Sequence, residues 1–318
     1  MNTREELQLM LRAAHLYFND NLTQQQVAKE LGSSRPTVSR LLRLARREGI
    51  VQITVVDPFA TVENVEDRLV EAFDLKQAVV VAGEGLSADL LRRRLGFAAA
   101  EYLQRTIDDG NLVGIGWGRT LQAVVEALDT ERQSAIQVFP LIGGLGQISP
   151  SLQVNDLARG LAQPFGGTWQ PFYVPAFVDD RAALEGLLHL TDVQSVIQTW
   201  PELDVALVGI GRFARQRQSS MLFASYVTDD ELQELEQRGA VGDLCGRFFD
   251  IRGEQCLLMS ELIGIPLEQL KALDNVIGVA GGEEKSAAIL GALRGGYLNV
   301  LVTDTLTARA ILEKHETG

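Results

Sequence analysis

The sequence predicts an α/β protein: an N-terminal, all-α head of the winged helix-turn-helix type, followed by a larger, mostly parallel α/β domain. Three observations predict this organisation. Two helical segments joined by a glycine turn lie within residues 22–47. A short β-branched run, typical of a wing, follows at residues 50–56. From residue 62 onward, apolar runs alternate with amphipathic helical segments, as in a parallel sheet covered by helices.

The head begins with a segment, residues 4–17, whose apolar residues recur at helical spacing and should support the two helices that follow. Thr23 is a predicted N-cap of the next helix, and Gln26 stands three residues later, as a capping box requires. Gly32 allows the positive φ that a helix end often needs. We therefore expect three helices in the head, with a tight turn at Gly32.

The third helix of the head is expected to start after Ser33 or Ser34 and to have two distinct faces. Its apolar residues recur at helical spacing and should face inward: Val38, Leu41, Leu42 and Ala45. The other face carries hydroxyl and guanidinium groups: Arg35, Thr37, Ser39, Arg40, Arg43, Arg46 and Arg47. Two helices, a glycine turn and a basic second helix are the pattern of a DNA-reading helix-turn-helix.

A recognition helix presents its N-terminal residues to base edges in the major groove. The predicted DNA-contacting residues are accordingly Ser34, Arg35, Thr37, Ser39, Arg40 and Arg43. The arginines further along the helix suit phosphates, which fix the position of a protein on DNA without reading its sequence. The alternative is a small three-helix bundle whose basic face is merely solvated.

The charge of the chain is divided unevenly between its two predicted parts. The net charge is −13 over 318 residues, but up to Asp57 the sequence holds 8 Lys and Arg against 6 Asp and Glu. The head therefore carries +2 and the remainder −15. An acidic body should repel DNA and leave the contact to the head. We expect a DNA-binding domain at residues 1–57 and a second domain at residues 58–318.

The cysteines, the histidines and the apolar segments limit the classes of protein to which the chain can belong. The two cysteines, Cys245 and Cys256, form no CxxC pair and are expected to be small buried side chains in a reducing compartment. The three histidines are scattered, so neither a metal site nor a cofactor is predicted. No apolar run of 18 residues and no signal peptide are seen, so we expect a cytoplasmic protein without a membrane partner.

The larger domain alternates strand and helix along the chain. Expected helices cover residues 62–73, 87–106, 120–128, 152–162, 182–197, 229–238, 283–293 and 305–313. Expected strands cover residues 77–82, 112–116, 135–142, 204–210, 275–280 and 299–302. In such sheets, ligands bind at the carboxyl ends of the strands, where loops lead into helix N-termini that attract anions.

Several glycine-rich junctions follow predicted strands and are candidate ligand loops. Residues 114–120 (GIGWGRT) open a helix and offer Arg119 and the Thr120 hydroxyl, which fits a phosphate cradle, although tight packing explains such turns equally well. Residues 208–211 (VGIG) form a second glycine turn. In residues 280–285 (AGGEEK), Lys285 stands at the first turn of a helix, against the helix dipole, which suggests an anionic partner or simple solvation. Asp243 could accept sugar hydroxyls or cap a turn.

These segments, in this order, resemble the SorC family of sugar-responsive transcriptional regulators: the helix-turn-helix, GIGWGRT, GDLCGRFFD, GVAGGEEKSAAILGALRGG and LVTDTLTA. The resemblance covers nearly the whole chain. It implies an effector domain similar to sugar-phosphate isomerases, a homotetramer or homodimer, and an operator near sugar-catabolic genes. It also implies a small effector, often a phosphorylated sugar, that changes affinity for the operator.

The resemblance further implies which residues bind the effector. These are Gly116, Trp117, Gly118, Arg119, Thr120, Asp243, Phe248, Gly281, Gly282 and Lys285. We expect a DNA-binding regulator and no enzyme activity, because a fold does not imply the activity of its relatives. Two alternatives stay open. One is an isomerase-like enzyme in which Asp243, Glu283 or Glu284 acts as a base. The other is a constitutive DNA-binding oligomer whose body binds no ligand.

Overall fold

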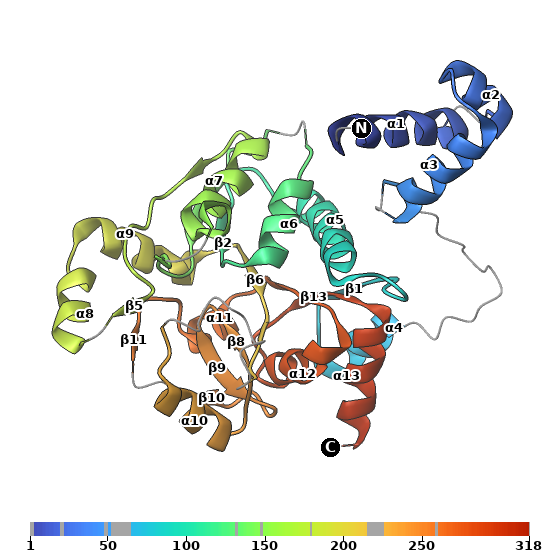
Figure 1. The fold of residues 1–318 in the computed structure, drawn as a ribbon. Coiled ribbons are helices and arrows are strands. Elements are labelled where there is room, and N and C mark those ends of the chain that lie inside the picture. The colour runs from blue at the N-terminus through green and yellow to red at the C-terminus, as the bar shows by residue number, and fades with distance from the viewer. Residues whose placement is uncertain are drawn as a thin grey trace. The chain divides into compact units, whose positions relative to one another are not determined.

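A computed structural model describes residues 3–19, 22–47, 50–51, 65–130, 133–146, 149–178, 180–214, 226–257 and 260–317. Contacts along the chain divide it into two units, Met1–Thr61 and Val62–Gly318. Each unit is built around its own apolar clusters (Figure 1). Among the described residues, no helix is both long and apolar enough to cross a membrane.

The N-terminal unit contains the three predicted helices: α1 (Thr3–Ala14), α2 (Gln24–Glu30) and α3 (Arg35–Arg47). A π-helical turn at His15–Asn19 extends α1. Thr23 caps α2 and forms the predicted capping box with Gln26. Gly32 ends the turn after α2 with φ of 59°, a conformation that glycine adopts without steric cost.

The core of this unit confirms the predicted inward face of α3. Val38, Leu41, Leu42 and Ala45 are all buried, and they pack with Val27 of α2 and the alanines of α1. The amphipathic spacing therefore sets the fold of the head, because only one face of α3 is apolar. The predicted wing, residues 50–56, falls almost wholly outside the described residues.

The larger unit is organised around a seven-stranded parallel sheet with the order β1-β13-β12-β6-β2-β3-β4. Its strands are β1 (Gln77–Val81), β2 (Leu112–Ile115), β3 (Gln137–Pro140), β4 (Thr168–Trp169), β6 (Val205–Gly209), β12 (Val276–Val279) and β13 (Val300–Asp304). The predicted α/β class and parallel sheet are confirmed. The central strands are nearly continuous apolar runs because both faces of the sheet are covered.

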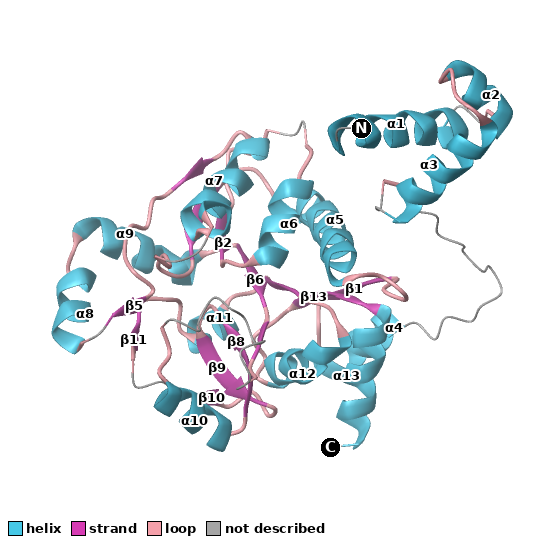
Figure 2. Cartoon of the chain, viewed as in Figure 1, coloured by secondary structure: helices cyan, strands magenta, loops and turns pink. Residues whose placement is uncertain are grey.

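Helices cover the two faces of the sheet (Figures 1 and 2). On one face lie α5 (Ala88–Thr106), α6 (Arg119–Ala127) and α7 (Val154–Ala162), whose apolar residues share one core cluster. On the other face lie α4 (Val65–Phe73), α12 (Ser286–Arg294) and α13 (Thr305–Thr317), which belong to a second cluster. Each cluster fills the space between one helix layer and the sheet.

The structure differs from the predicted elements in three places. The single helix expected over residues 182–197 is two helices, α8 (Arg181–Leu188) and α9 (Thr191–Thr199), because the backbone is extended at Leu190. A short helix, α11 (Leu267–Ala272), was not predicted. Short 3₁₀ turns lie at residues 150–152, 163–165, 200–202 and 283–285.

The third difference is a pair of small antiparallel sheets beside the large one, near α10 (Asp229–Gln237) (Figure 2). One contains β7 (Gly211–Arg212), β8 (Ala240–Leu244), β9 (Arg247–Asp250) and β10 (Gln255–Cys256). The other pairs β5 (Phe177–Val178) with β11 (Glu261–Leu262). The β8–β9 hairpin brings residues 243–248 back toward the carboxyl edge of the parallel sheet.

Candidate functional site

Helix α3 presents its predicted DNA-contacting side chains away from the core of the head. Arg35, Arg40 and Arg43 are exposed, and Ser39 is partly exposed. The Ser34 hydroxyl accepts the Thr37 N–H at 3.3 Å and lies 2.8 Å from the Thr37 hydroxyl. Ser34 therefore caps the helix, and this hydroxyl pair sits at its N-terminal end, where a recognition helix meets base edges.

The carboxyl edge of the parallel sheet has a topological switch point between β2 and β6. Successive strands after β2 are added outward through β3 and β4, whereas those after β6 are added in the opposite direction through β12 and β13. The two strands pair in parallel, and Gly116 N–H donates to the Leu207 carbonyl at 2.9 Å. Ligands of open α/β sheets bind in the crevice at such a point. The predicted glycine turns after β2 and β6 thus lie side by side.

The turn after β2 allows a ligand to come close to the backbone. Gly118 has φ of 121°, a conformation that side chains disfavour, and it starts α6 without any side-chain cap. The first N–H groups of α6 are therefore open to a ligand. Arg119 is exposed at the first position of α6, and Thr120 is partly exposed at the second. Trp117 is partly buried and packs against the apolar core beneath.

Asp243 is buried on β8 beside the two glycine turns. A Cβ at Gly211 would lie 1.8 Å from Asp243 Oδ1, so glycine is required there for the carboxyl group to fit. Asp243 Oδ2 accepts the Gly246 N–H at 3.2 Å. Burial raises the pKa of Asp243 to about 6, although the Gly246 N–H and the charge of Lys285 both act to lower it.

Lys285 joins this group from the loop after β12. Its Nζ donates to the Ile210 carbonyl at 2.9 Å, in the turn that follows β6. Burial lowers the pKa of Lys285, Asp243 and Glu284 oppose that shift, and the positive charges of Arg92 and Arg119 reinforce it. Lys285 is thus held at the sheet edge, near a buried carboxyl group and two arginines.

Arg92 was not predicted to be part of the site. It lies on α5, donates to the Asp89 carboxylate and influences Lys285 electrostatically. The pKa of Asp89 is lowered, chiefly by its hydrogen bond with Arg92, and Arg119 contributes to the shift. The run of three arginines at 92–94, in a helix that follows a strand, was the sequence signal for this cation. Three cations therefore gather at this edge of the sheet.

The glycines after β12 are shaped by Asp304 at the end of β13. Gly282 N–H donates to Asp304 Oδ2 at 2.8 Å and to the Thr307 hydroxyl at 2.9 Å. A Cβ at Gly281 would lie 2.5 Å from that same carboxylate oxygen. Asp304 is 1% exposed, so it has a structural role in holding the loop that carries Lys285. Sequence reasoning had not assigned it a role.

Phe248 pairs with Asp243 across the β8–β9 hairpin, so the two side chains share one face of it. Phe248 is 4% exposed and packs edge-on against Phe213, with ring centroids 5.9 Å apart. It also lines a separate cavity between β9 and helices α8 and α9. The structure therefore brings together Gly116, Gly118, Arg119, Asp243 and Lys285, and it places Phe248 beside Asp243 as its cross-strand neighbour, so its contact with an effector stays a prediction.

Two family models and several characterised relatives match this chain. A sugar-binding domain model (Sugar-bind) matches residues 57–313, and a Crp-like helix-turn-helix model (HTH_Crp_2) matches residues 7–60. The sorbitol operon regulator of Klebsiella pneumoniae is 33% identical over 317 residues, covering 98% of this chain and all of that protein. The chain belongs to the SorC family of transcriptional regulators.

Other comparisons agree with this membership. The deoxyribonucleoside regulator of Bacillus subtilis is 35% identical to this SorC-family chain over 320 residues, covering 97% of the chain and 98% of the relative. The crystal structure of full-length SorC from Klebsiella pneumoniae superposes with a TM-score of 0.76 at 34% identity, covering 96% of this chain and 98% of that one. A transcriptional regulator from Streptococcus pneumoniae TIGR4 gives a TM-score of 0.74 at 28% identity, over 80% and 97% of the two chains.

This SorC-family chain is a sugar-responsive, DNA-binding transcriptional regulator. Its relatives over the full length are regulators with a helix-turn-helix, not enzymes. The isomerase-like alternative is therefore set aside, and Asp243, Glu283 and Glu284 are considered only as binding or structural groups.

Proposed function

We propose that residues 1–57 bind an operator through α3 and that residues 58–318 bind the effector and hold the oligomer together. The exposed row of Arg35, Arg40 and Arg43, opposite a fully apolar face, supports the first role. The hydroxyls of Ser34 and Thr37 and the side chain of Ser39 complete the proposed contact surface. The division of the chain at Thr61 is consistent with these two domains.

We propose further that the effector is a phosphorylated sugar or polyol, and that the regulated genes serve its catabolism. The observation that carries this proposal is the gathering of Arg92, Arg119 and Lys285 at the carboxyl edge of a parallel sheet. The start of α6 after Gly118, which has no side-chain cap, brings backbone N–H groups to the same edge. Cations and open N–H groups at a helix start favour a phosphate, while Asp243 suits a sugar hydroxyl.

The names of two relatives support a sugar or polyol, since one is a sorbitol operon regulator and another a deoxyribonucleoside regulator. Regulation requires that the effector bind one arrangement of the protein better than another. In a homodimer or homotetramer in the cytoplasm, a small rotation between effector domains would alter the spacing of two heads on DNA. Such heads must lie about 34–36 Å apart, or at a multiple of that distance, to reach one face of the duplex.

A thermal-shift screen of the full chain tests the effector class. Hexitol 6-phosphates and pentose 5-phosphates are compared with the free sugars and polyols. A ligand at about 100 times its dissociation constant should stabilise the protein by roughly 2.7 kcal/mol and raise its melting temperature by several degrees. Lys285→Ala and Thr120→Ala should abolish the shift, whereas Lys271→Ala, an exposed lysine on α11, should leave it unchanged. Stabilisation by free sugars alone would refute the phosphate.

Operator binding is tested separately by a mobility-shift assay on DNA from upstream of the protein's own gene. Arg40→Ala and Arg43→Ala should each weaken binding, and each lost phosphate contact should lower the salt dependence by about one unit of log–log slope. Arg159→Gln, an exposed arginine on α7 with 62% of its side chain accessible, serves as the matched control. Unchanged affinity in both α3 variants would contradict the proposed DNA surface.

A further inference from the structure

A cavity lies in the larger unit, and its lining includes none of the three cations Arg92, Arg119 and Lys285. Its volume is about 540 Å³, within the range of about 300–1,000 Å³ that small-molecule sites occupy. Helices α8 and α9 form one wall, and β9, β10 and the segment from β11 to α11 form the other. Most of the lining is apolar, as it is in sites that bind small organic molecules.

Arg247 and Arg181 are the two cations that line this cavity, and the guanidinium of Arg247 is incompletely satisfied. Nη2 donates to the carbonyls of Leu262 and Gly264, at 3.4 and 3.0 Å. Nε is buried without a hydrogen-bond partner, and Nη1 donates to no group in the part of the chain that the structure describes. Within the same residues, no carboxylate lies within 4 Å of this guanidinium. A partly buried charge without a counter-ion is costly, so an anion in the cavity would be stabilised.

Gln269 on α11 is a further polar group at the cavity, which Arg181, Gln255, Ser260 and Glu261 also line. Gln269 Oε1 is buried and accepts no hydrogen bond in the described structure, so it can accept one from a ligand hydroxyl or amide. The apolar wall is firmly held, because the Trp200 indole N–H donates to the Pro140 carbonyl at 3.0 Å. Leu184 and Leu188 of α8 face this wall from the lining of the same cavity. The cavity thus offers the Arg247 guanidinium, the Gln269 acceptor and a fixed apolar surface, while its other two charged lining residues, Arg181 and Glu261, are paired with each other.

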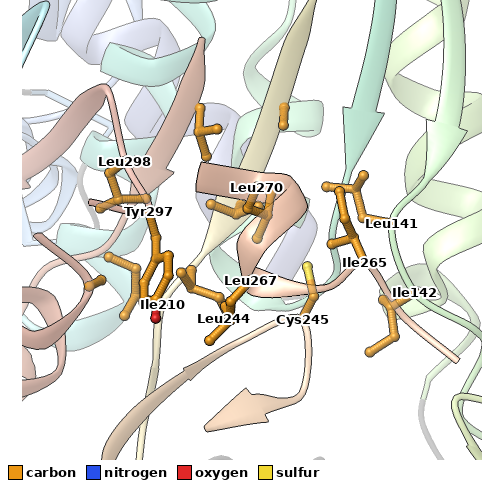
Figure 3. Close-up of a cluster of buried hydrophobic side chains, with 14 of the residues drawn as sticks. Leu141, Ile142, Ile210, Leu244, Cys245, Ile265, Leu267, Leu270, Tyr297 and Leu298 are labelled. Carbon is orange, nitrogen blue, oxygen red and sulfur yellow. The ribbon is translucent and has the colours of Figure 1, made fainter. Parts of the chain in front are cut away.

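This cavity is distinct from the edge that carries Lys285. In the β8–β9 hairpin, Asp243 pairs with Phe248, whereas Arg247 pairs with Leu244. Neighbouring residues of a strand point to opposite faces, so Arg247 and Asp243 project from opposite faces of the hairpin. The Cys245–Gly246 turn between them has positive φ at both residues. Cys245 belongs to the cluster of buried hydrophobic side chains that Figure 3 shows, and a Cβ at Gly116 would lie 3.2 Å from its Sγ. Arg247 therefore faces away from Asp243, whereas Gly246 and Phe248, which both neighbour Asp243, also line the cavity.

We propose that this cavity is a second ligand site, which binds a small monocarboxylate with an apolar body through Arg247 and Gln269. A planar carboxylate with a single charge matches one guanidinium. A phosphate dianion would need more donors than this largely apolar lining provides. Glu261 at the rim is already paired with Arg181, 3.4 Å away, so its charge is partly neutralised. The proposal is independent of the nature of the sugar effector.

Calorimetric titration of the full-length protein tests this site with hexanoate and benzoate as probes, and with hexanamide and benzamide as uncharged matches. The carboxylates should bind and the amides should not. Arg247→Gln should weaken carboxylate binding roughly ten- to hundredfold, the effect of losing a charge-assisted hydrogen bond. Arg247→Lys should bind with intermediate affinity. Leu188→Trp, at a partly exposed position, should fill the cavity and block binding without removing the cation.

Arg159→Gln again provides the exposed-arginine control and should bind as the wild type does. Absence of carboxylate binding to the wild type, or equal binding to Arg247→Gln, would overturn the proposal. Binding that is lost in Lys285→Ala but kept in Arg247→Gln would assign the carboxylate to the other site and would also overturn it. Sedimentation velocity completes the test: if Leu188→Trp dissociates the oligomer while no carboxylate binds, the cavity holds a second copy of the chain instead.

Discussion

The buried carboxyl group of Asp243 makes a quantitative prediction about stability and pH. Burial raises its pKa from the ordinary value of 3.8 to about 6, so the folded protein holds this proton more tightly than the unfolded chain does. The stabilisation from this group is complete below about pH 4 and is lost as the pH rises through about 6. A shift of about two pKa units corresponds to roughly 3 kcal/mol. About 1.5 kcal/mol of that loss falls between pH 5 and pH 8.

Asp243→Asn removes the ionisation and keeps a side-chain oxygen for the Gly246 N–H. Between pH 5 and pH 8, the wild type should lose about 1.5 kcal/mol of unfolding free energy through this group, and the variant should not. The melting temperature of the variant minus that of the wild type should therefore rise by roughly 3–6 °C over this range. Urea denaturation of both proteins at several pH values measures this difference. A difference that stays constant across the range would refute the buried, proton-holding carboxyl group. Thr303→Val is a suitable control because the threonine hydroxyl does not titrate in this range.

Three further predictions concern the fold of each unit. Thr303→Val should stabilise the protein by about 1 kcal/mol in urea denaturation, because the Thr303 hydroxyl is fully buried and has no hydrogen-bond partner among the described residues. Destabilisation would indicate a hydrogen bond that this geometry lacks. Gly32→Ala should lower the unfolding free energy of the head by roughly 1 kcal/mol. The loss comes from the φ of 59° alone, since a Cβ there meets no atom within 4 Å. An unchanged melting transition of the head would contradict that strain. Gly211→Ala should be far more damaging and should reduce the yield of folded protein, because its Cβ would lie 1.8 Å from the Asp243 carboxyl group; normal expression and melting would show that β7 can move.

The parallel sheet was predictable because its strands are short apolar runs that alternate with helices. The strand expected at residues 77–82 is β1 (Gln77–Val81), and the helix expected at residues 87–106 is α5 (Ala88–Thr106). The antiparallel hairpin of β8 and β9 was missed. Its two-residue turn has positive φ at Cys245 and Gly246, and cysteine gives no signal for the first of these positions, where asparagine or aspartate is usual.

The site was only partly predictable because the order of the strands in the sheet cannot be derived from the sequence. Arg92 follows β1 along the chain, whereas Lys285 follows β12, and these strands lie two places apart in the sheet. Only the folded order brings the two cations to one edge. Asp304 escaped notice for a related reason: its partner Gly282 precedes it by 22 residues, and the two meet because β12 and β13 are neighbours.

The formal net charge of residues 58–318 is about −15, which by itself suggests that the larger unit repels anions. The local arrangement argues otherwise, because charges in water act over about 8 Å at physiological ionic strength. Lys285 is influenced by the positive charges of Arg92 and Arg119, while acidic residues also lie on other elements such as α10. The same screening lets the head approach DNA although the body is acidic. A regulator built this way can admit a small anion at the sheet edge while its body stays off the DNA, so the two binding events need not compete for one surface.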